Sequence, residues 1–288
     1  MANPQFPLYI VSKGRFTDKL RKTTLAFEKM RTPFRIIVEH QEYQDYCDTV
    51  GKEHVLILDP EFKRKFETCE QGEKSGKTGS GPARNFAWEH SISEGYSHHW
   101  VMDDNIEYFY RFNDNLKVPV SDGTIFKCME DFCLRYENIG MAGPEYFMFI
   151  SRKNLVKPFR LNTRIYSCNF IRNDIRFRWR GMYNEDTDLS LRMLKAGWCT
   201  VLFQAFLQGK MTTQTCKGGN TDEIYTEGTL EKSRMLQRNH PDLVKVVERY
   251  GRWHHDINYS GFKQKLIKKP GIDVPDVDDY GMQLIQLD

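Results

Sequence analysis

The chain has 288 residues, with 42 lysines and arginines against 39 aspartates and glutamates, for a formal net charge of +3. It is 40% hydrophobic and 28% charged, a composition that excludes a disordered or fibrous protein. The near balance of charge excludes a histone-like polycation, although it does not exclude a local basic surface.

The cysteine pattern and the hydropathy point to a protein of the cytoplasm. The seven cysteines are odd in number and form no C-x-x-C pair, which argues against a zinc site or a disulfide framework. No apolar run approaches the roughly 20 residues of a membrane span, and the apolar stretch near the N-terminus is too short for a signal peptide. We therefore expect a soluble, cytoplasmic protein without a membrane partner.

Strands and helices alternate in the first 60 residues. Short apolar runs predict strands at residues 8–11, 34–39 and 55–58, and the segments 18–30 and 41–50 between them predict helices. This alternation is typical of parallel βαβ units.

The rest of the chain predicts a mixture of both element types around a glycine-rich, charged loop at residues 61–81. The expected strands lie at residues 99–102, 140–150, 166–171, 175–179 and 200–206. The expected helices lie at residues 82–94, 123–137, 185–196, 229–239 and 243–250. The pattern predicts an α/β core followed by a helical C-terminal extension.

Acidic and amide side chains follow the strand at 99–102 directly, as Asp103-Asp104-Asn105. Ligands bind at the carboxyl ends of strands in open α/β sheets, and hard oxygen ligands suit Mg²⁺ or Mn²⁺. Asp and Asn are also common in polar turns. Taken alone, the motif leaves a metal site and a simple turn equally open.

A glycine-rich segment, Gly79-Ser80-Gly81, precedes Arg84 and Asn85 at a predicted helix start. Backbone N–H groups at such a start attract phosphate, and Arg84 would add a planar donor. The segment lacks the Gly-Lys-Ser/Thr ending of a Walker A motif. A flexible loop with an ordinary helix cap remains the alternative.

Three carboxylates, Glu185, Asp186 and Asp188, fall in the first turn of the predicted helix at 185–196. They could simply complement the helix dipole. Alternatively, one of them points into a cleft and acts as a general base toward an alcohol. The sequence leaves both interpretations open.

Two weaker signals lie near the ends of the chain. Ser12-Lys13-Gly14-Arg15 follows the first strand and could bind a nucleotide, although a solvated turn is the simpler interpretation. His255 could complete a metal site from the C-terminal side, although such a histidine is more often a surface or packing residue.

Residues 152–180 hold nine lysines and arginines against one acid, Asp174. If residues 176–180 (RFRWR) form a strand, three arginines would share one face and two aromatic rings the other. A solvated edge strand blunted by charge is the alternative. The imbalance favours an anionic partner such as nucleic acid.

The order of these motifs along the chain resembles that of a known family of proteins. Ser-Lys-Gly-Arg follows the first strand, Gly-Pro-Ala-Arg-Asn opens a helix and Asp-Asp-Asn follows the next strand. Glu-Asp-Thr-Asp-Leu-Ser-Leu-Arg (185–192) and Lys-Gly-Gly-Asn (217–220) come after them. Over residues 8–262 the chain resembles GT-A fold nucleotide-sugar glycosyltransferases. More narrowly, it resembles the TET/JBP-associated glycosyltransferases, which decorate hydroxymethylated pyrimidines in DNA, largely in bacteriophages.

The resemblance implies an α/β, GT-A (Rossmann-like) fold with a mixed central sheet. The core would span residues 1–215, with a nucleotide-sugar half at about 1–105 and an acceptor half at about 106–215. A helical extension at 216–270 and an acidic, loosely held tail at 271–288 would follow.

The resemblance also implies roles for individual residues. Asp186 takes the place of the catalytic base, with Glu185 as the alternative. Asp103, Asp104 and Asn105 take the place of the DxD metal motif, with an amide at its third position and His255 as a further ligand of Mn²⁺ or Mg²⁺. The residues expected to hold the donor, a UDP-sugar, are Ser12, Lys13, Arg15, Arg84, Asn85, Asp103, Lys210, Lys217, Gly218 and Gly219.

The implied acceptor is a hydroxymethylated base in DNA, either flipped out of the duplex or unpaired. The residues expected to contact DNA are Arg164, Arg176, Arg178, Trp179, Arg180, Tyr183, Lys263 and Lys265, with the aromatic rings stacking on the base. The implied reaction is metal-dependent and inverting. A protein or polysaccharide acceptor remains open, and so does a non-catalytic nucleic-acid-binding module, for which Asn105 is the best argument.

Overall fold

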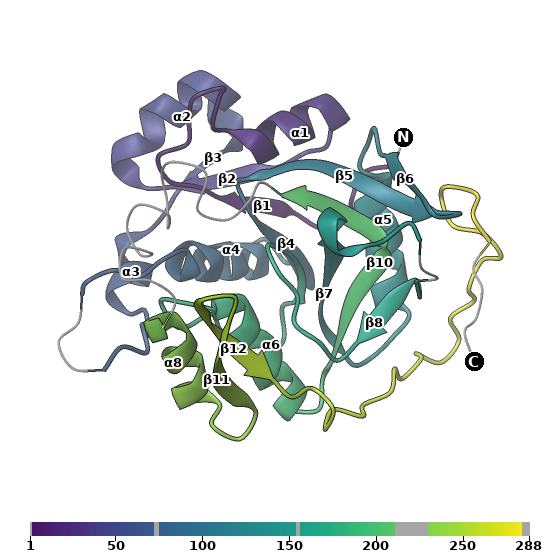
Figure 1. The fold of residues 1–288 in the computed structure, drawn as a ribbon. Coiled ribbons are helices and arrows are strands. Elements are labelled where there is room, and N and C mark those ends of the chain that lie inside the picture. Colours follow the sequence, from purple (N-terminus) through teal and green to yellow (C-terminus); the bar gives the residue numbers. More distant parts are fainter. Residues whose placement is uncertain (1, 72–74, 154–155, 211–229, 284–288) are drawn as a thin grey trace.

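A ten-stranded mixed sheet forms the centre of the computed structural model, which describes residues 2–71, 75–153, 156–210 and 230–283 (Figure 1). Its strands are β1 (Leu8–Val11), β2 (Arg35–Val38), β3 (Val55–Ile57), β4 (His98–Asp103), β5 (Ile106–Asn113), β6 (Leu116–Pro119), β7 (Ile139–Tyr146), β8 (Phe159–Leu161), β9 (Cys168–Arg172) and β10 (Cys199–Lys210). Their order is β3-β2-β1-β4-β9-β7-β10-β5-β6, and β8 pairs with the first half of β10. The predicted mixed central sheet is confirmed.

Strand direction brings six strand ends to one edge of the sheet. Strands β1 to β4 are parallel to one another. Strand β9 is antiparallel to both β4 and β7, and β10 is parallel to β7. The C-terminal ends of β1, β2, β3, β4, β7 and β10 therefore share an edge, which is where ligands bind in open α/β sheets.

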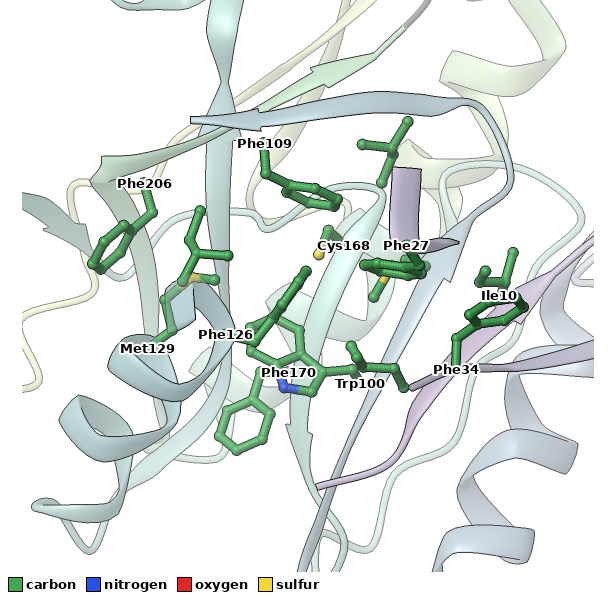
Figure 2. Close-up of a cluster of buried hydrophobic side chains, with 14 of the residues drawn as sticks. Ile10, Phe27, Phe34, Trp100, Phe109, Phe126, Met129, Cys168, Phe170 and Phe206 are labelled. Carbon is green, nitrogen blue, oxygen red and sulfur yellow. The ribbon is translucent and has the colours of Figure 1, made fainter. Parts of the chain in front are cut away.

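One face of the sheet carries an aromatic core. Ile10 and Trp100 point to this face and meet Phe27 of α1 (Lys22–Met30) and Phe126 of α5 (Thr124–Leu134). Figure 2 shows the rings of Phe27, Phe109 and Phe126 gathered above Trp100, and their centroids lie 5.0 to 5.8 Å apart. Aromatic pairs in this range add to the stability gained from burial alone.

The opposite face has its own core, because side chains alternate along each strand. Tyr9 and Val101, the neighbours of Ile10 and Trp100, point this way. They pack against Trp88 of α4 (Gly81–Ser93), while Leu189 of α6 (Glu185–Lys195) joins the same cluster. Burial on both faces explains why the central strands are almost continuously apolar in sequence.

The first 60 residues follow the prediction closely. The remaining helices of this region are η1 (His40–Glu42), α2 (Tyr43–Val50), η2 (Lys52–His54) and α3 (Pro60–Arg64). The first helix begins at Lys22, later than expected, and the loop expected at 61–81 starts inside α3. Within the described ranges, no helix is both long enough and apolar enough to cross a membrane.

The prediction of a strand at residues 175–179 is wrong, because this segment does not pair with the sheet. Trp179 donates its backbone N–H to Asn85 Oδ1 at 2.8 Å, and Asn85 Nδ2 donates to the Trp179 carbonyl at 3.0 Å. A side-chain amide thus takes the place of a neighbouring strand. The alternation of arginines and aromatics therefore does not build a two-faced ribbon.

The C-terminal extension is only partly helical. Helix α8 (Leu230–Asn239) agrees with the prediction, but the helix expected at 243–250 is wrong. That segment forms β11 (Val244–Arg249), which pairs with β12 (Arg252–Ile257) in a hairpin. Tyr250 and Gly251 both have positive φ, 55° and 68°, as a tight hairpin turn requires. Both elements lie beside α6 (Figure 1), where Leu191, Leu236 and Val244 form a small core.

The C-terminal tail is held against the sheet rather than loose. In Figure 1 it runs from β12 toward β6 and α5. The Tyr280 ring lies under the Arg111 guanidinium at 5.2 Å, and Asp279 lies 3.0 Å from Lys127. These contacts fasten the acidic segment up to residue 283. The boundary expected near residue 215 lies outside the described residues.

Candidate active site

A cavity of about 1110 Å³ opens at the edge where the six strand ends meet. The segments after β1, β4 and β7 line it, together with Lys210 at the end of β10 and the first turn of α6. Lys232 of α8 and His254 and His255 of β12 add a wall from the C-terminal extension. The cavity therefore lies between the edge of the sheet and the C-terminal elements α8 and β12.

Asp103, at the end of β4, is held between two cations. Arg84 Nη2 donates to its Oδ1 atom and Lys210 Nζ to its Oδ2 atom, both at 2.5 Å. Burial alone would raise the pKa of Asp103, but Lys210 and Arg84 outweigh it and hold that pKa far below its usual value. Asp103 is therefore a permanent carboxylate.

Asp104 is held in the same way on the other side of the strand end. Ser12 Oγ donates to its Oδ2 atom at 2.6 Å, and Arg15 forms an ion pair with its Oδ1 atom. All four carboxylate oxygens of Asp103 and Asp104 thus accept hydrogen bonds from this chain.

The described side chains offer no ready-made metal site. In the described part of the chain, no group of three or more His, Cys, Asp or Glu side chains is placed to hold a metal ion. Asn105 Oδ1 is buried without a described hydrogen-bond partner, and His255 lies on the cavity wall. An ion at Asp103 would be repelled by Arg84 and Lys210, and breaking a buried ion pair to make room for it would cost about 3–5 kcal/mol.

Helix α6 brings the two candidate bases to the cavity. Asn184 precedes it in the left-handed conformation (φ 53°), so the helix starts abruptly at the cavity wall. Glu185 accepts from Ser80 Oγ at 2.9 Å. Asp186 accepts from the Ser167 N–H at 3.2 Å and from Asn169 Nδ2 at 3.4 Å. Both predicted catalytic carboxylates therefore line the cavity in fixed orientations.

The environment of Asp186 differs from that of Asp103. Burial raises the pKa of Asp186 to about 7, with Glu185 and Asp103 adding to the shift and Arg84 opposing it. Arg84 Nη1 lies 3.7 Å from Asp186 Oδ1, beyond hydrogen-bond distance. A carboxylate with a pKa near neutrality is well matched to accepting a proton from an alcohol.

This shift predicts a pH profile. Since a base must be ionised to act, kcat/KM for sugar transfer should fall about tenfold per pH unit below a pKa near 7. The measurement is initial transfer rate against pH, and the residual rate of Asp186→Asn should lack this acid limb. An acid limb near pH 4, the usual range of carboxylates, would contradict the assignment.

The third carboxylate of the turn has a structural role. Asp188 is buried and accepts from Arg192 Nε at 2.7 Å, from Arg180 Nε at 3.1 Å and from His240 Nε2 at 2.9 Å. Burial would raise the pKa of Asp188, but His240 and the two arginines bring it to about 2. Arg180, predicted to contact DNA, is thus part of an internal ion-pair network.

Arg84 and Asn85 do not reach the cavity, contrary to prediction. The Arg84 side chain is 1% exposed and lies over the Trp179 ring at 4.7 Å, where it serves as counter-ion to Asp103. Both polar atoms of the Asn85 side chain are engaged by the Trp179 backbone. These two residues hold the structure next to the cavity in place and are not among the residues that line it.

The other predicted donor residues lie on the cavity wall where they are described. Ser12, Lys13, Arg15, Asp103 and Lys210 all line it. Lys217, Gly218 and Gly219 lie outside the described residues. The sequence did not reveal five further charged residues of this wall: Glu39, Lys63, Arg64, Lys77 and Lys232.

Glu39 extends the wall from the end of β2. Lys63 lies 2.5 Å and Lys13 3.1 Å from its Oε1 atom. Burial would raise the pKa of Glu39, but hydrogen bonds from Lys63, Gln41 and Lys13 lower it to about 2. Its place directly after a parallel strand was the signal that could have identified it.

The two aromatic residues that were expected to stack on a base are buried. Trp179 and Tyr183 are 2% and 5% exposed, so neither ring offers a face to a base. Trp179 belongs to the core under α4 and α6, and Tyr183 packs against Met182 and Met235.

The predicted basic surface is dispersed. Arg178 pairs with Glu89 at 2.7 Å, and Arg164 packs over the Tyr166 ring at 4.9 Å, whereas Arg176 is exposed. Lys263 and Lys265 belong to a segment that follows the opposite edge of the sheet, where the Lys265 carbonyl accepts from Asn138, just before β7. These cations do not converge on the cavity.

The fold and the cavity define an α/β enzyme that binds its ligand at the carboxyl edge of a mixed sheet. The sequence model of the TET-Associated Glycosyltransferase family matches residues 6–219. The chain therefore belongs to this family and is a glycosyltransferase, for which a nucleotide-sugar is the donor. No curated protein matches the chain.

Proposed function

We propose that the protein transfers a sugar from a nucleotide-sugar, a UDP-sugar by expectation, to the hydroxymethyl group of a 5-hydroxymethylpyrimidine in DNA, with inversion. The observation that carries the proposal is Asp186, a carboxylate whose pKa is raised to about 7 and which faces a cavity large enough for two substrates. Family membership supports the donor class.

The proposed chemistry is a single displacement at the anomeric carbon. The acceptor oxygen forms a bond to that carbon while its proton passes to Asp186. The bond from the anomeric carbon to the phosphate oxygen breaks, and its electron pair remains on the leaving nucleoside diphosphate. Holding both substrates in line makes the step effectively unimolecular. Ser12, Lys13 and Glu39, which line the cavity after β1 and β2, would orient the nucleoside end.

Exposed aromatic side chains support an acceptor with a flat ring. Phe149 lines the cavity and is 59% exposed, and its neighbour Met148 is 62% exposed. Trp253 is 40% and Tyr250 is 98% exposed in the hairpin that also carries the cavity-lining residue His254, although neither ring lines the cavity itself. An exposed ring at the cavity, such as Phe149, is suited to stacking on a base, because every base offers a flat π-face.

Phe149→Ala should raise the KM for DNA and leave the affinity for the nucleotide nearly unchanged. Loss of one base-stacking ring costs about 1–3 kcal/mol, which corresponds to about a 5- to 150-fold effect. Steady-state kinetics with varied DNA and calorimetry with UDP measure the two effects. Ile57→Ala, at a residue that is 38% exposed at the end of β3, is the control. An unchanged KM for DNA would contradict a stacking role for Phe149.

The decisive experiment is a donor screen. Hydroxymethylcytosine DNA and hydroxymethyluracil DNA are incubated with a panel of nucleotide-sugars, and the nucleosides are analysed by mass spectrometry. A mass increase of one sugar on a hydroxymethylated base is expected, with unmodified DNA as the control. No transfer from any donor to either DNA would overturn the proposed acceptor.

The dispersed cations give weight to a second candidate, a protein or polysaccharide acceptor. Of the nine cations at 152–180, Arg172, Arg178 and Arg180 are paired with carboxylates of this chain. Salt dependence separates the candidates, because each phosphate contact makes DNA binding weaken as salt rises. DNA binding that is absent or insensitive to salt would favour the second candidate.

A further inference from the structure

Protein cations already occupy the place at which a glycosyltransferase of this fold could bind a divalent ion. Asp103 accepts from Arg84 and Lys210, and Asp104 from Arg15. These cations neutralise the two carboxylates that a divalent ion would bind, and they would also repel the ion. The positive charge that is needed to compensate the donor phosphates can therefore come from the chain itself.

We propose that Lys210 and Lys232 supply the positive charge that stabilises the departing diphosphate, and that sugar transfer needs no divalent cation. The inference rests on the proposed function only in assuming a nucleoside diphosphate donor. It does not depend on the acceptor.

The backbone aims Lys210 into the cavity. The pairing of β10 with β5 shifts register between Gly209 and Lys210, and such irregularities often re-aim a side chain beside an active site. Lys210 Nζ donates to Asp103 at 2.5 Å and to Ser167 Oγ at 2.7 Å. An ammonium group has three donors, so one is left by the described residues for a phosphate oxygen.

Lys232 comes from outside the family match and approaches from the other wall. It lines the cavity from α8, and its ammonium interacts electrostatically with Glu185, Asp186 and Lys210. Burial, with Lys210 adding to it, lowers the pKa of Lys232. An anion bound between the two ammonium groups would offset the repulsion between them.

The proposed step balances in charge. When the bond from the anomeric carbon to the phosphate oxygen breaks, the electron pair adds one negative charge to the nucleoside diphosphate. Lys210 and Lys232 offset that charge at the phosphate, while Asp186 takes the acceptor proton. Fixed charges of this kind stabilise a transition state without having to reorganise.

Binding of UDP to the whole protein, measured by calorimetry, tests the inference without relying on transfer. The wild-type Kd should agree within about twofold in chelator and in Mn²⁺, a difference below about 0.5 kcal/mol. Lys210→Ala and Lys232→Ala should each weaken UDP binding by about 10- to 100-fold, as expected for loss of a charge-assisted contact. A tenfold or greater tightening by Mn²⁺ in the wild type, or unchanged affinity in both variants, would overturn it.

Lys210→Ala also provides a diagnostic gain. Removing the ammonium frees Asp103 Oδ2, so Mn²⁺ should tighten UDP binding in this variant and not in the wild type. The matched control is Lys195→Ala, which breaks the exposed ion pair with Asp242 (2.7 Å) on the far part of α6. Circular dichroism establishes that each variant is folded.

The failure of this inference can be told from failure of the proposed function. Titration of Mn²⁺ into the protein, with and without UDP, addresses the cation whatever the acceptor is, and micromolar Mn²⁺ binding would overturn the inference. A failed acceptor screen with intact, metal-independent UDP binding would overturn the proposed acceptor and support the inference.

Discussion

Replacement of Asp186 by asparagine should lower sugar transfer by about 10²- to 10⁴-fold, the usual contribution of a general base. The amide has nearly the shape of the carboxylate and can still accept from the Ser167 N–H, so the first turn of α6 keeps its position. It cannot take a proton from the acceptor. UDP affinity should remain within about threefold of wild type, because the affected step follows donor binding.

Two comparisons sharpen this prediction. Glu185→Gln tests the neighbouring carboxylate, and a larger loss there would reassign the base to Glu185. Asp174→Asn is the control, since Asp174 lies on the exposed surface and pairs with Arg172 at 2.6 Å. Wild-type rates for Asp186→Asn would contradict its role as a base.

Replacement of Arg84 by alanine should destabilise the fold by about 3–5 kcal/mol, the cost of leaving a buried charge without its partner. Arg84 is 1% exposed, pairs with Asp103 and packs on the Trp179 ring. Its removal leaves Lys210 as the remaining described partner of Asp103. It also leaves the repulsion of Asp186 by Glu185 and Asp103 without a neighbouring positive charge from Arg84. Chemical denaturation followed by circular dichroism measures the change in free energy of unfolding.

A second measurement distinguishes Arg84 from an ordinary packing residue. Arg84 lowers the pKa of Asp186, so its removal should move the acid limb of the pH profile upward. The matched control is Arg178→Ala, which breaks a more exposed pair with Glu89 and should cost about 1 kcal/mol or less. Equal destabilisation by both variants would show that burial of the Arg84 pair carries no special weight.

The parallel half of the sheet could be predicted because its signals are local. The apolar run at residues 8–11 and the polar residues after it define a buried strand and its ligand-binding end. The same reasoning places Asp103 at the cavity. Such arguments need only the periodicity of the chain and the common direction of parallel strands.

The errors concern contacts between segments distant in sequence. Nothing local to residues 176–180 reveals that Asn85, some 90 positions earlier, occupies the Trp179 backbone. The sequence suggests that Arg84 binds phosphate, whereas in the structure it is the counter-ion of Asp103 and lies close to Asp186. The β5–β6 hairpin has a local signal, Asp114-Asn115 with positive φ at both residues, that was missed.

Because α8 and β12 contribute to the cavity, the carboxylates and the residues that could set substrate preference come from different parts of the chain. The strand ends and the first turn of α6, which carry the carboxylates, lie within the family match, whereas Lys232, His254 and His255 lie beyond it. One part of the chain thus carries the proposed reacting groups, and another part adds a wall of the cavity. Exchanging residues 230–257 between family members would therefore be a way to alter substrate preference while the catalytic carboxylates stay the same.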